Sequence, residues 1–156
     1  MKNNPKHMKD ALLSVIRDMA KHPEDFCYCP EKDFTRKRKL PFEKVLTLLV
    51  KMGGHSLRDE ILDCLDFEDV PPSVSALVQQ RSKILPKALE YLFREFTDRC
   101  QKPKLYKGYR LLAVDGSDLQ FTANPNDPLS YFPGVNGQKP YSFLHLNALY
   151  DLNSGL

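Results

Sequence analysis

The sequence predicts an α+β protein with a helical N-terminal part and a C-terminal part made of strands. Up to residue 100, apolar residues recur at spacings of three and four, which is the period of amphipathic helices. Beyond residue 101, nearly continuous apolar runs alternate with turn-forming residues, as strands and their connections do. This change of pattern predicts two domains, residues 1–101 and 102–156.

Five amphipathic segments account for the helical part. Pro41 is suited to the first turn of the second helix, where a missing N–H costs nothing. Ser56 can cap the third helix, and Ser73 or Ser75 the fourth, because a serine hydroxyl accepts a hydrogen bond from a free backbone N–H. Pro86 is expected to end or kink the fourth helix. The expected helices cover residues 8–20, 41–52, 57–65, 76–85 and 87–100.

Two strands are expected in the C-terminal part. Residues 109–114 form a nearly continuous apolar run, and residues 142–150 form the second strand. Residues 122–140 contain four prolines, two glycines and three asparagines, so this stretch is expected to be a loop. Residues 151–155 have the composition of a turn. Since a turn implies a following strand, we expect the sheet to be incomplete within these 156 residues.

Composition excludes several classes of protein. Hydrophobic residues make up 42% of the 156 residues and charged residues 28%, which is typical of a globular chain. The longest apolar runs, residues 45–50 and 111–114, are far shorter than the roughly 20 residues that cross a bilayer. The four cysteines form no C-x-x-C pair, which argues against a zinc site, and no secretory signal accompanies them. We therefore expect a reduced, cytoplasmic location and no membrane partner.

Charge is distributed in blocks, although the net charge is only +3. Residues 36–39 are an unbroken basic run, and residues 71–108 hold eight bases against three acids. A basic face binds polyanions by releasing their counterions. Candidate phosphate contacts are Arg36, Lys37, Arg38, Lys39, Arg81 and Lys83, and candidate contacts to base edges are Gln79 and Gln80. A solvated polar surface is the alternative explanation.

The sharpest local feature is Leu112-Ala-Val-Asp-Gly-Ser-Asp118. A carboxylate at the exit of a buried strand, here Asp115, can hold a divalent metal over a sheet. An acid in this position is more often a turn former or a helix cap. Asp118 could assist Asp115, although a turn is its expected role. His145 is expected to be a hydrogen-bonded histidine of the sheet rather than a metal ligand.

Four motifs follow one another along the chain: Phe34-Thr-Arg-Lys-Arg-Lys-Leu-Pro-Phe-Glu43, Ser56-Leu-x-x-Glu60, Val74-Ser-Ala-Leu-Val-Gln-Gln-Arg-Ser-Lys-Ile84 and Leu112-Ala-Val-Asp-Gly-Ser117. In this order they resemble the N-terminal part of bacterial insertion-sequence transposases of the DDE type, specifically the IS-four group. The resemblance covers about residues 20–156.

The resemblance implies a helical N-terminal DNA-binding domain followed by the first two antiparallel strands of an incomplete ribonuclease-H-like domain. Asp115 then corresponds to the first catalytic, metal-binding aspartate. In such enzymes three carboxylates hold two Mg²⁺ or Mn²⁺ ions, which drive cleavage and strand transfer of DNA. Since the second aspartate and the glutamate are missing, the isolated chain is expected to be inactive. The implied partner is double-stranded DNA at transposon ends, with a homodimer left open, and the implied location is the nucleoid of a bacterial cytoplasm.

Two other classes of function stay open at this point. One is a stand-alone DNA-binding regulator with a helix-turn-helix core and an accessory hairpin. The other is a protein-interaction module whose basic patches are incidental. The turn at residues 151–155 favours the transposase over the regulator, because a complete small regulator is not expected to stop at the opening of a strand.

Overall fold

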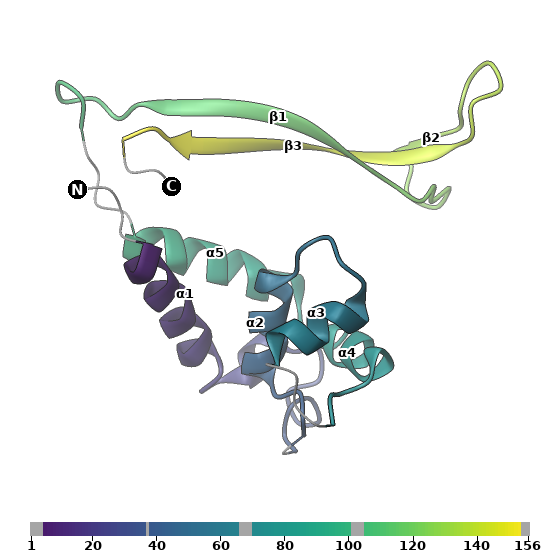
Figure 1. Ribbon diagram of the computed structural model, residues 1–156. Helices are drawn as coiled ribbons and strands as arrows, with labels where there is room; N and C mark the ends of the chain where they lie inside the picture. The colour runs from purple at the N-terminus through teal and green to yellow at the C-terminus, as the bar shows by residue number, and fades with distance from the viewer. Residues whose placement is uncertain (1–4, 37, 66–69, 101–104, 154–156) are drawn as a thin grey trace. The chain divides into compact units, whose positions relative to one another are not determined.

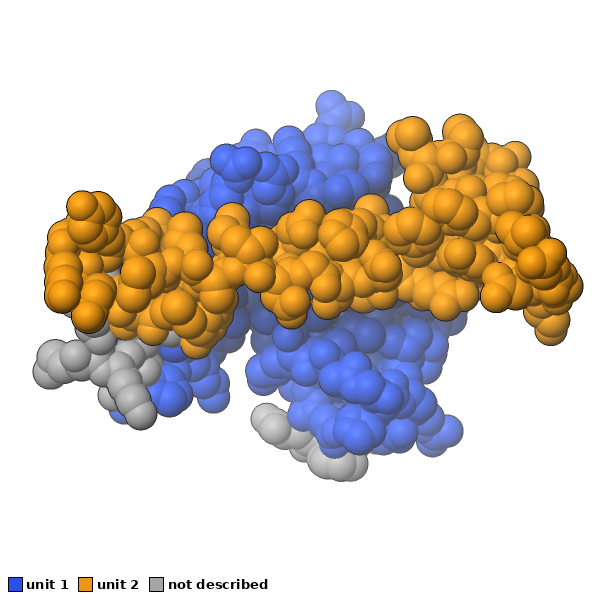
Figure 2. Space-filling model, turned by 90° about the horizontal axis from the view of Figure 1, so that it is seen from above, with its two compact units in different colours: residues 1, 3–101 blue, residues 2, 102–156 orange. Residues whose placement is uncertain are grey.

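The computed structural model describes residues 5–36, 38–65, 70–100 and 105–153. It confirms the α+β class: the residues described form five α-helices and one three-stranded antiparallel sheet (Figure 1). The chain divides into two compact units, residues 3–101 and residues 102–156 (Figure 2). The first is called the helical unit below and the second the sheet unit.

The helical unit contains all five expected helices, with a short 3-10 helix after the first. Two of the expected serine caps are present: the side chain of Ser56 accepts a hydrogen bond from the backbone N–H of Asp59, and that of Ser73 from Ala76. The helices are α1 (Pro5–Met19), η1 (Pro23–Phe26), α2 (Phe42–Lys51), α3 (Leu57–Cys64), α4 (Val74–Arg81) and α5 (Pro86–Cys100).

The end of α4 differs from the expectation. The helix stops at Arg81, and Pro86 does not kink it but begins α5. The intervening segment pairs with the chain after η1: Tyr28 N–H donates to the carbonyl of Lys83 at 3.0 Å, and Leu85 N–H donates to the carbonyl of Phe26 at 2.9 Å. These two long-range hydrogen bonds replace the helical ones that the local pattern predicts.

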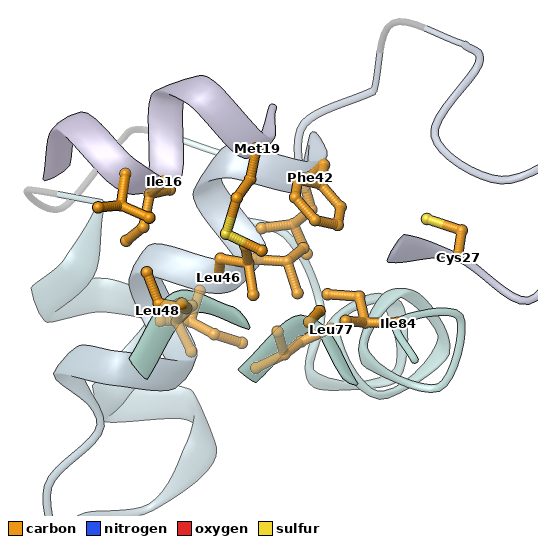
Figure 3. Packing of buried hydrophobic residues seen from close by; sticks show 14 of the residues in the cluster. Ile16, Met19, Cys27, Phe42, Leu46, Leu48, Leu77 and Ile84 are labelled. Carbon is orange, nitrogen blue, oxygen red and sulfur yellow. The ribbon is translucent and has the colours of Figure 1, made fainter. Parts of the chain in front are cut away.

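One hydrophobic core holds the helical unit together. Figure 3 shows Ile16 and Met19 of α1 close to Leu46 of α2, with Leu77 of α4 nearby. Val45 and Leu46 have no exposed area. Residues from α3 and α5, among them Ile61 and Ala88, belong to the same buried cluster. The core is therefore shared by all five α-helices, and α2 contributes four of its buried residues: Phe42, Val45, Leu46 and Leu48.

A buried carboxylate fixes the turn between α2 and α3. Glu60 is 7% exposed, and its Oε1 accepts hydrogen bonds from the backbone N–H groups of Gly53 at 2.8 Å and His55 at 3.1 Å. These bonds satisfy two backbone N–H groups just before α3, and they offset part of the desolvation free energy of burying the Glu60 carboxylate. The α2–turn–α3 pair is therefore a defined structural element.

The sheet unit contains β1 (Leu112–Phe121), β2 (Tyr131–Phe132) and β3 (Tyr141–Asp151) in the order β1-β3-β2. β1 and β3 pair antiparallel over ten residues, from Leu112 opposite Asp151 to Phe121 opposite Ser142. The first strand therefore begins later and runs further than the expected 109–114. The expected loop 122–140 also contains the two residues of β2.

Most side chains of β1 and β3 are exposed; the buried residues of these strands are Ser142 and Asp151, at the two ends of β3. Val114 and Leu149, opposite each other on one face, are 67% and 66% exposed, and Leu146 on the other face is 48% exposed. The expectation that Asp115 follows a buried strand is therefore wrong. Asp115 lies inside β1, and the side chains next to it along the strand, on both faces of the sheet, are exposed to solvent.

Candidate nucleic-acid interface

The basic run follows a tight turn centred on a buried carboxylate. Asp33 is 9% exposed. Its Oδ2 accepts a hydrogen bond from Cys29 N–H at 3.0 Å, and its own N–H donates to the carbonyl of Cys29 at 2.8 Å. Both bonds close the chain back on itself just before the arginines, so the basic loop starts from a fixed point.

Phe34 sets the direction of the loop after this turn. Its φ of 56° lies in the left-handed region, which is unfavourable for a residue with a Cβ and a bulky ring. The ring packs edge-on against Phe42, the first residue of α2, with 5.4 Å between the ring centroids and 87° between the planes. Packing on the core compensates for the backbone strain and holds the loop in one conformation.

Lys83 ties this loop to the segment after α4. Its Nζ lies 3.9 Å from Oδ1 of Asp33 and 5.8 Å from the centroid of the Phe34 ring. A cation near an aromatic face is attracted by the ring quadrupole. Lys83 was expected within the fourth helix, residues 76–85, but it lies beyond the end of α4, and its charge interacts with protein groups.

The basic loop and α4 meet around two adjoining pockets. Arg36, Arg38, Gln80 and Lys83 line the first, of about 390 Å³. Arg38 and Gln80 also line the second, of about 490 Å³. Its remaining walls include two more of the candidate DNA contacts, Lys39 and Gln79. Six of the eight candidates, far apart in the sequence, thus lie on one surface.

The remaining two candidates are Lys37 and Arg81. Lys37 is outside the described residues. Arg81 is exposed at the end of α4 and lines neither pocket. Arg36 and Arg38 are exposed and have no hydrogen-bonding or ion-pair partner among the residues that the structure describes. Lys39 donates from Nζ to the carbonyl of Val70 at 2.9 Å, which joins the loop to the chain before α4. The two arginines are therefore the cations best placed to bind an anion.

The two glutamines are in different environments, although both were expected to contact base edges. Gln79 is exposed, and its Nε2 donates to the Oγ of Ser75 at 3.4 Å. Gln80 is only 7% exposed, and its Oε1 is buried without a partner among the described residues. Gln80 was predicted as a DNA contact, but its burial was not predicted. The available signal was the spacing of three from Leu77, which puts Gln80 on the buried side of α4.

Asp115 and Asp118 cannot act together at one site. Within β1, Asp115 lies opposite Ala148 and Asp118 opposite His145, and side chains three positions apart in a strand point to opposite faces. Among the described residues no group of three or more His, Cys, Asp or Glu could hold a metal ion. One carboxylate does not fit a two-metal centre, so no metal-dependent step follows from these residues.

Asp118 forms a cross-strand pair instead of the expected turn. Its Oδ1 lies 2.7 Å from Nδ1 of His145. The hydrogen bond to Asp118 raises the pKa of His145, and the side chain of Asn147 adds to the shift. The imidazole lies over Gly116, where a Cβ would be 3.1 Å from Cε1 of the ring. Glycine at this position leaves room for the histidine beside its partner.

The pair predicts that the sheet loses stability as the pH rises. Because the pKa of His145 is raised on folding, its contribution is complete below the unfolded value of about 6.5 and disappears as the pH passes the higher folded value. NMR titration of the ring should show the raised pKa, and Asp118→Asn should lower it. Asp115→Asn, on the same strand but the other face, is the matched control and should leave it unchanged. Equal titration in wild type and Asp118→Asn would contradict the pairing.

No family model, no curated protein and no solved structure matches the chain. None of the described helices combines the length and the apolar character needed to cross a membrane. Function is therefore inferred from the residues and their arrangement.

Proposed function

We propose that the helical unit binds double-stranded DNA through the surface formed by Arg36, Arg38 and Lys39 of the loop and Gln79 of α4, with Gln80 and Lys83 lining the same pockets. The observation that carries this proposal is the meeting of the basic loop with α4 around two adjoining pockets. Neither segment alone distinguishes a binding surface from a solvated one. Their convergence concentrates positive charge beside an exposed amide side chain.

The chemistry of these side chains suits a phosphate backbone. Arginine binds phosphate oxygens through a planar fork of N–H donors, and Arg36 and Arg38 have no competing partner among the described residues. The loop that carries them is anchored by Asp33 and Phe34, so little conformational freedom is lost on binding. Gln79 is the candidate for contact with a base edge, since it is exposed.

We further propose that the chain is the N-terminal part of a DDE transposase of the IS-four group, with Asp115 as its first catalytic carboxylate. The order of the motifs supports this proposal: they lie in the basic loop, at the start of α3, in α4 and in β1. In that class, three carboxylates bind Mg²⁺ or Mn²⁺ for the cleavage and transfer of DNA strands at transposon ends. A location at the nucleoid of a bacterial cytoplasm follows from the same proposal, and a homodimer stays open.

A second candidate is a stand-alone DNA-binding regulator. The turn between α2 and α3, held by Glu60, favours it, since two helices joined by a tight turn are a common DNA-binding element.

The transposase and the regulator differ in whether the complete protein cuts and joins DNA. For the transposase, we expect the 156-residue chain to neither nick nor join DNA in Mg²⁺. A longer chain carrying the other two carboxylates should do so, and Asp115→Asn should abolish that activity. Strand transfer by the 156 residues alone, or an active Asp115→Asn, would contradict the assignment.

DNA binding itself predicts a steep salt dependence. If about four phosphates are neutralised, the slope of log affinity against log salt is about −3.6. Replacing Arg36, Arg38 and Lys39 together by glutamine should flatten the slope by about 2.7, since each lost phosphate contact changes it by about 0.9. Fluorescence anisotropy of a labelled duplex between low and moderate salt measures both slopes.

The matched control for this experiment is the triple replacement of Lys9, Lys51 and Lys87 by glutamine. These lysines are exposed on α1, α2 and α5, away from both pockets, and their loss changes the net charge by the same amount. The control should keep the wild-type slope. Equal flattening in both triple variants would show a diffuse charge effect, and absence of binding at low salt would overturn the proposal.

A further inference from the structure

We propose that the pocket between the basic loop and α4, whose lining includes Phe34, Arg36, Arg38, Gln80 and Lys83, binds one unstacked nucleotide of the DNA, with adenine preferred. The lining also contains the carboxylates of Glu31 and Asp33, the second of which lies beside Lys83. The inference rests on the proposed DNA binding and specifies what one site on that surface recognises. Binding at this site differs from contact with the DNA backbone alone, because a base must enter the pocket.

The first observation is the buried, unsatisfied side-chain oxygen of Gln80. Its side chain lines the pocket, yet Oε1 is buried and has no hydrogen-bond donor among the described residues. A buried acceptor without a donor is destabilising and uncommon in native proteins. Oε1 itself is buried in this conformation, but the terminal torsion of glutamine is soft, so rotation about it can present the amide to the pocket. The protein thus keeps an unused hydrogen-bonding group at the wall of a pocket.

The second observation is the combination of chemical requirements in the pocket. Oε1 needs an N–H or O–H donor, which a fully ionised phosphate does not have. Arg36 and Arg38 are exposed and lack partners among the described residues, so both are free to bind an anion. A nucleotide suits both groups, with its base towards Gln80 and its phosphate towards the arginines. The carboxamide pairs best with adenine, which offers an amino N–H beside the acceptor N7.

Size and shape agree with such an occupant. The volume of about 390 Å³ falls within the range of about 300–1,000 Å³ found for small-molecule sites. Phe34 gives the pocket an aromatic wall, and the interaction of Lys83 with Asp33 and this ring holds the wall in place. A base in a continuous duplex is stacked and cannot enter. A bulged nucleotide is already partly unstacked, so moving its base into the pocket costs little unstacking free energy.

The test compares three labelled DNAs with the full 156-residue chain: a fully paired duplex, the same duplex with one bulged adenine, and the same duplex with a bulged abasic residue. The abasic bulge keeps the backbone and its flexibility but lacks the base. We expect the adenine bulge to bind about tenfold tighter than the abasic bulge. Gln80→Met, of similar shape, should abolish this preference, while Gln79→Met, its exposed neighbour on α4, should retain it.

Each outcome decides between the two proposals. Equal affinity for adenine and abasic bulges in the wild-type chain, with tight binding to all three DNAs, overturns the nucleotide site and leaves DNA binding intact. Retention of the preference in Gln80→Met also overturns the site. If circular dichroism shows that Gln80→Met is unfolded, Gln80→Glu replaces it, and the wild-type comparison needs no variant.

If no DNA binds, the proposed function fails, and the pocket is tested by itself with adenosine monophosphate and inorganic phosphate. Shifts of the Gln80 side-chain amide resonances with the nucleotide but not with phosphate would support the site. Identical effects of the two ligands, or none, would overturn it.

Discussion

Replacing Leu46 by alanine is expected to lower the free energy of unfolding of the helical unit by about 2–5 kcal/mol. Leu46 lies in α2 with no exposed area and belongs to the core shared by the helices. Removing its branched end loses transfer free energy and leaves a cavity that close-packed neighbours fill only in part. Urea denaturation followed by far-ultraviolet circular dichroism measures the loss as a lower midpoint at an unchanged slope.

Val50→Ala is the matched control, since it removes apolar atoms from the same helix at a residue that is 42% exposed. Its free energy of unfolding should change by no more than about 0.5 kcal/mol. Similar losses in the two variants would show that α2 does not present its Leu46 side to the core. Because Phe34 of the basic loop packs on Phe42 of the same helix, the core also supports the proposed DNA surface.

The helices could be predicted because their causes are local. The apolar spacing of α2 defines a buried stripe, and Ser56 and Ser73 offer caps at the starts of α3 and α4. The end of α4 could not be predicted, because Ile84 and Leu85 continue a helical pattern. The hydrogen bonds of that segment with Phe26 and Tyr28 depend on residues far away in the sequence.

The candidate site was predicted in its composition but not in its arrangement. Arg36, Arg38 and Gln79 are exposed, as expected of contacts to a polyanion. The burial of Gln80 and the interaction of Lys83 with Asp33 arise from the packing of the loop on α4. The spacing of three from buried Leu77 could have indicated the burial of Gln80, whereas nothing in the local sequence indicates that Lys83 pairs with Asp33.

The strand that contains Asp115 was predicted with the wrong bounds, and for this reason Asp118 was expected in a turn close to Asp115. Gly116, Ser117 and Asp118 favour turns when considered alone, but β3 supplies a pairing partner for each of them. Strand propensity depends strongly on such neighbours. Once β1 is known to continue to Phe121, alternation along the strand places Asp115 and Asp118 on opposite faces.

The sheet unit is expected to exchange its amide hydrogens much faster than the core helix. β1 is an edge strand, and large apolar side chains on both faces of the hairpin, such as Val114 and Leu146, are about half exposed or more. A hairpin without a covering layer is only marginally stable in water. Amides in the paired parts of β1 and β3 should therefore exchange at least about a hundredfold faster than those of α2, by hydrogen exchange followed with NMR.

The dependence on protein concentration is the control, because an open edge with apolar faces can also pair with a second copy of the chain. Protection of β1 that rises with concentration would show self-association, whereas fast exchange at every concentration would show an uncovered hairpin. Equal protection of β1 and α2 in a dilute monomer would contradict the prediction.

The hydrogen bond between Arg110 and the buried Asp151, at 2.7 Å, holds the end of the β1–β3 pair where Leu112 lies opposite Asp151. Arg110→Gln should therefore speed amide exchange at this end before it affects the amides beside Asp115.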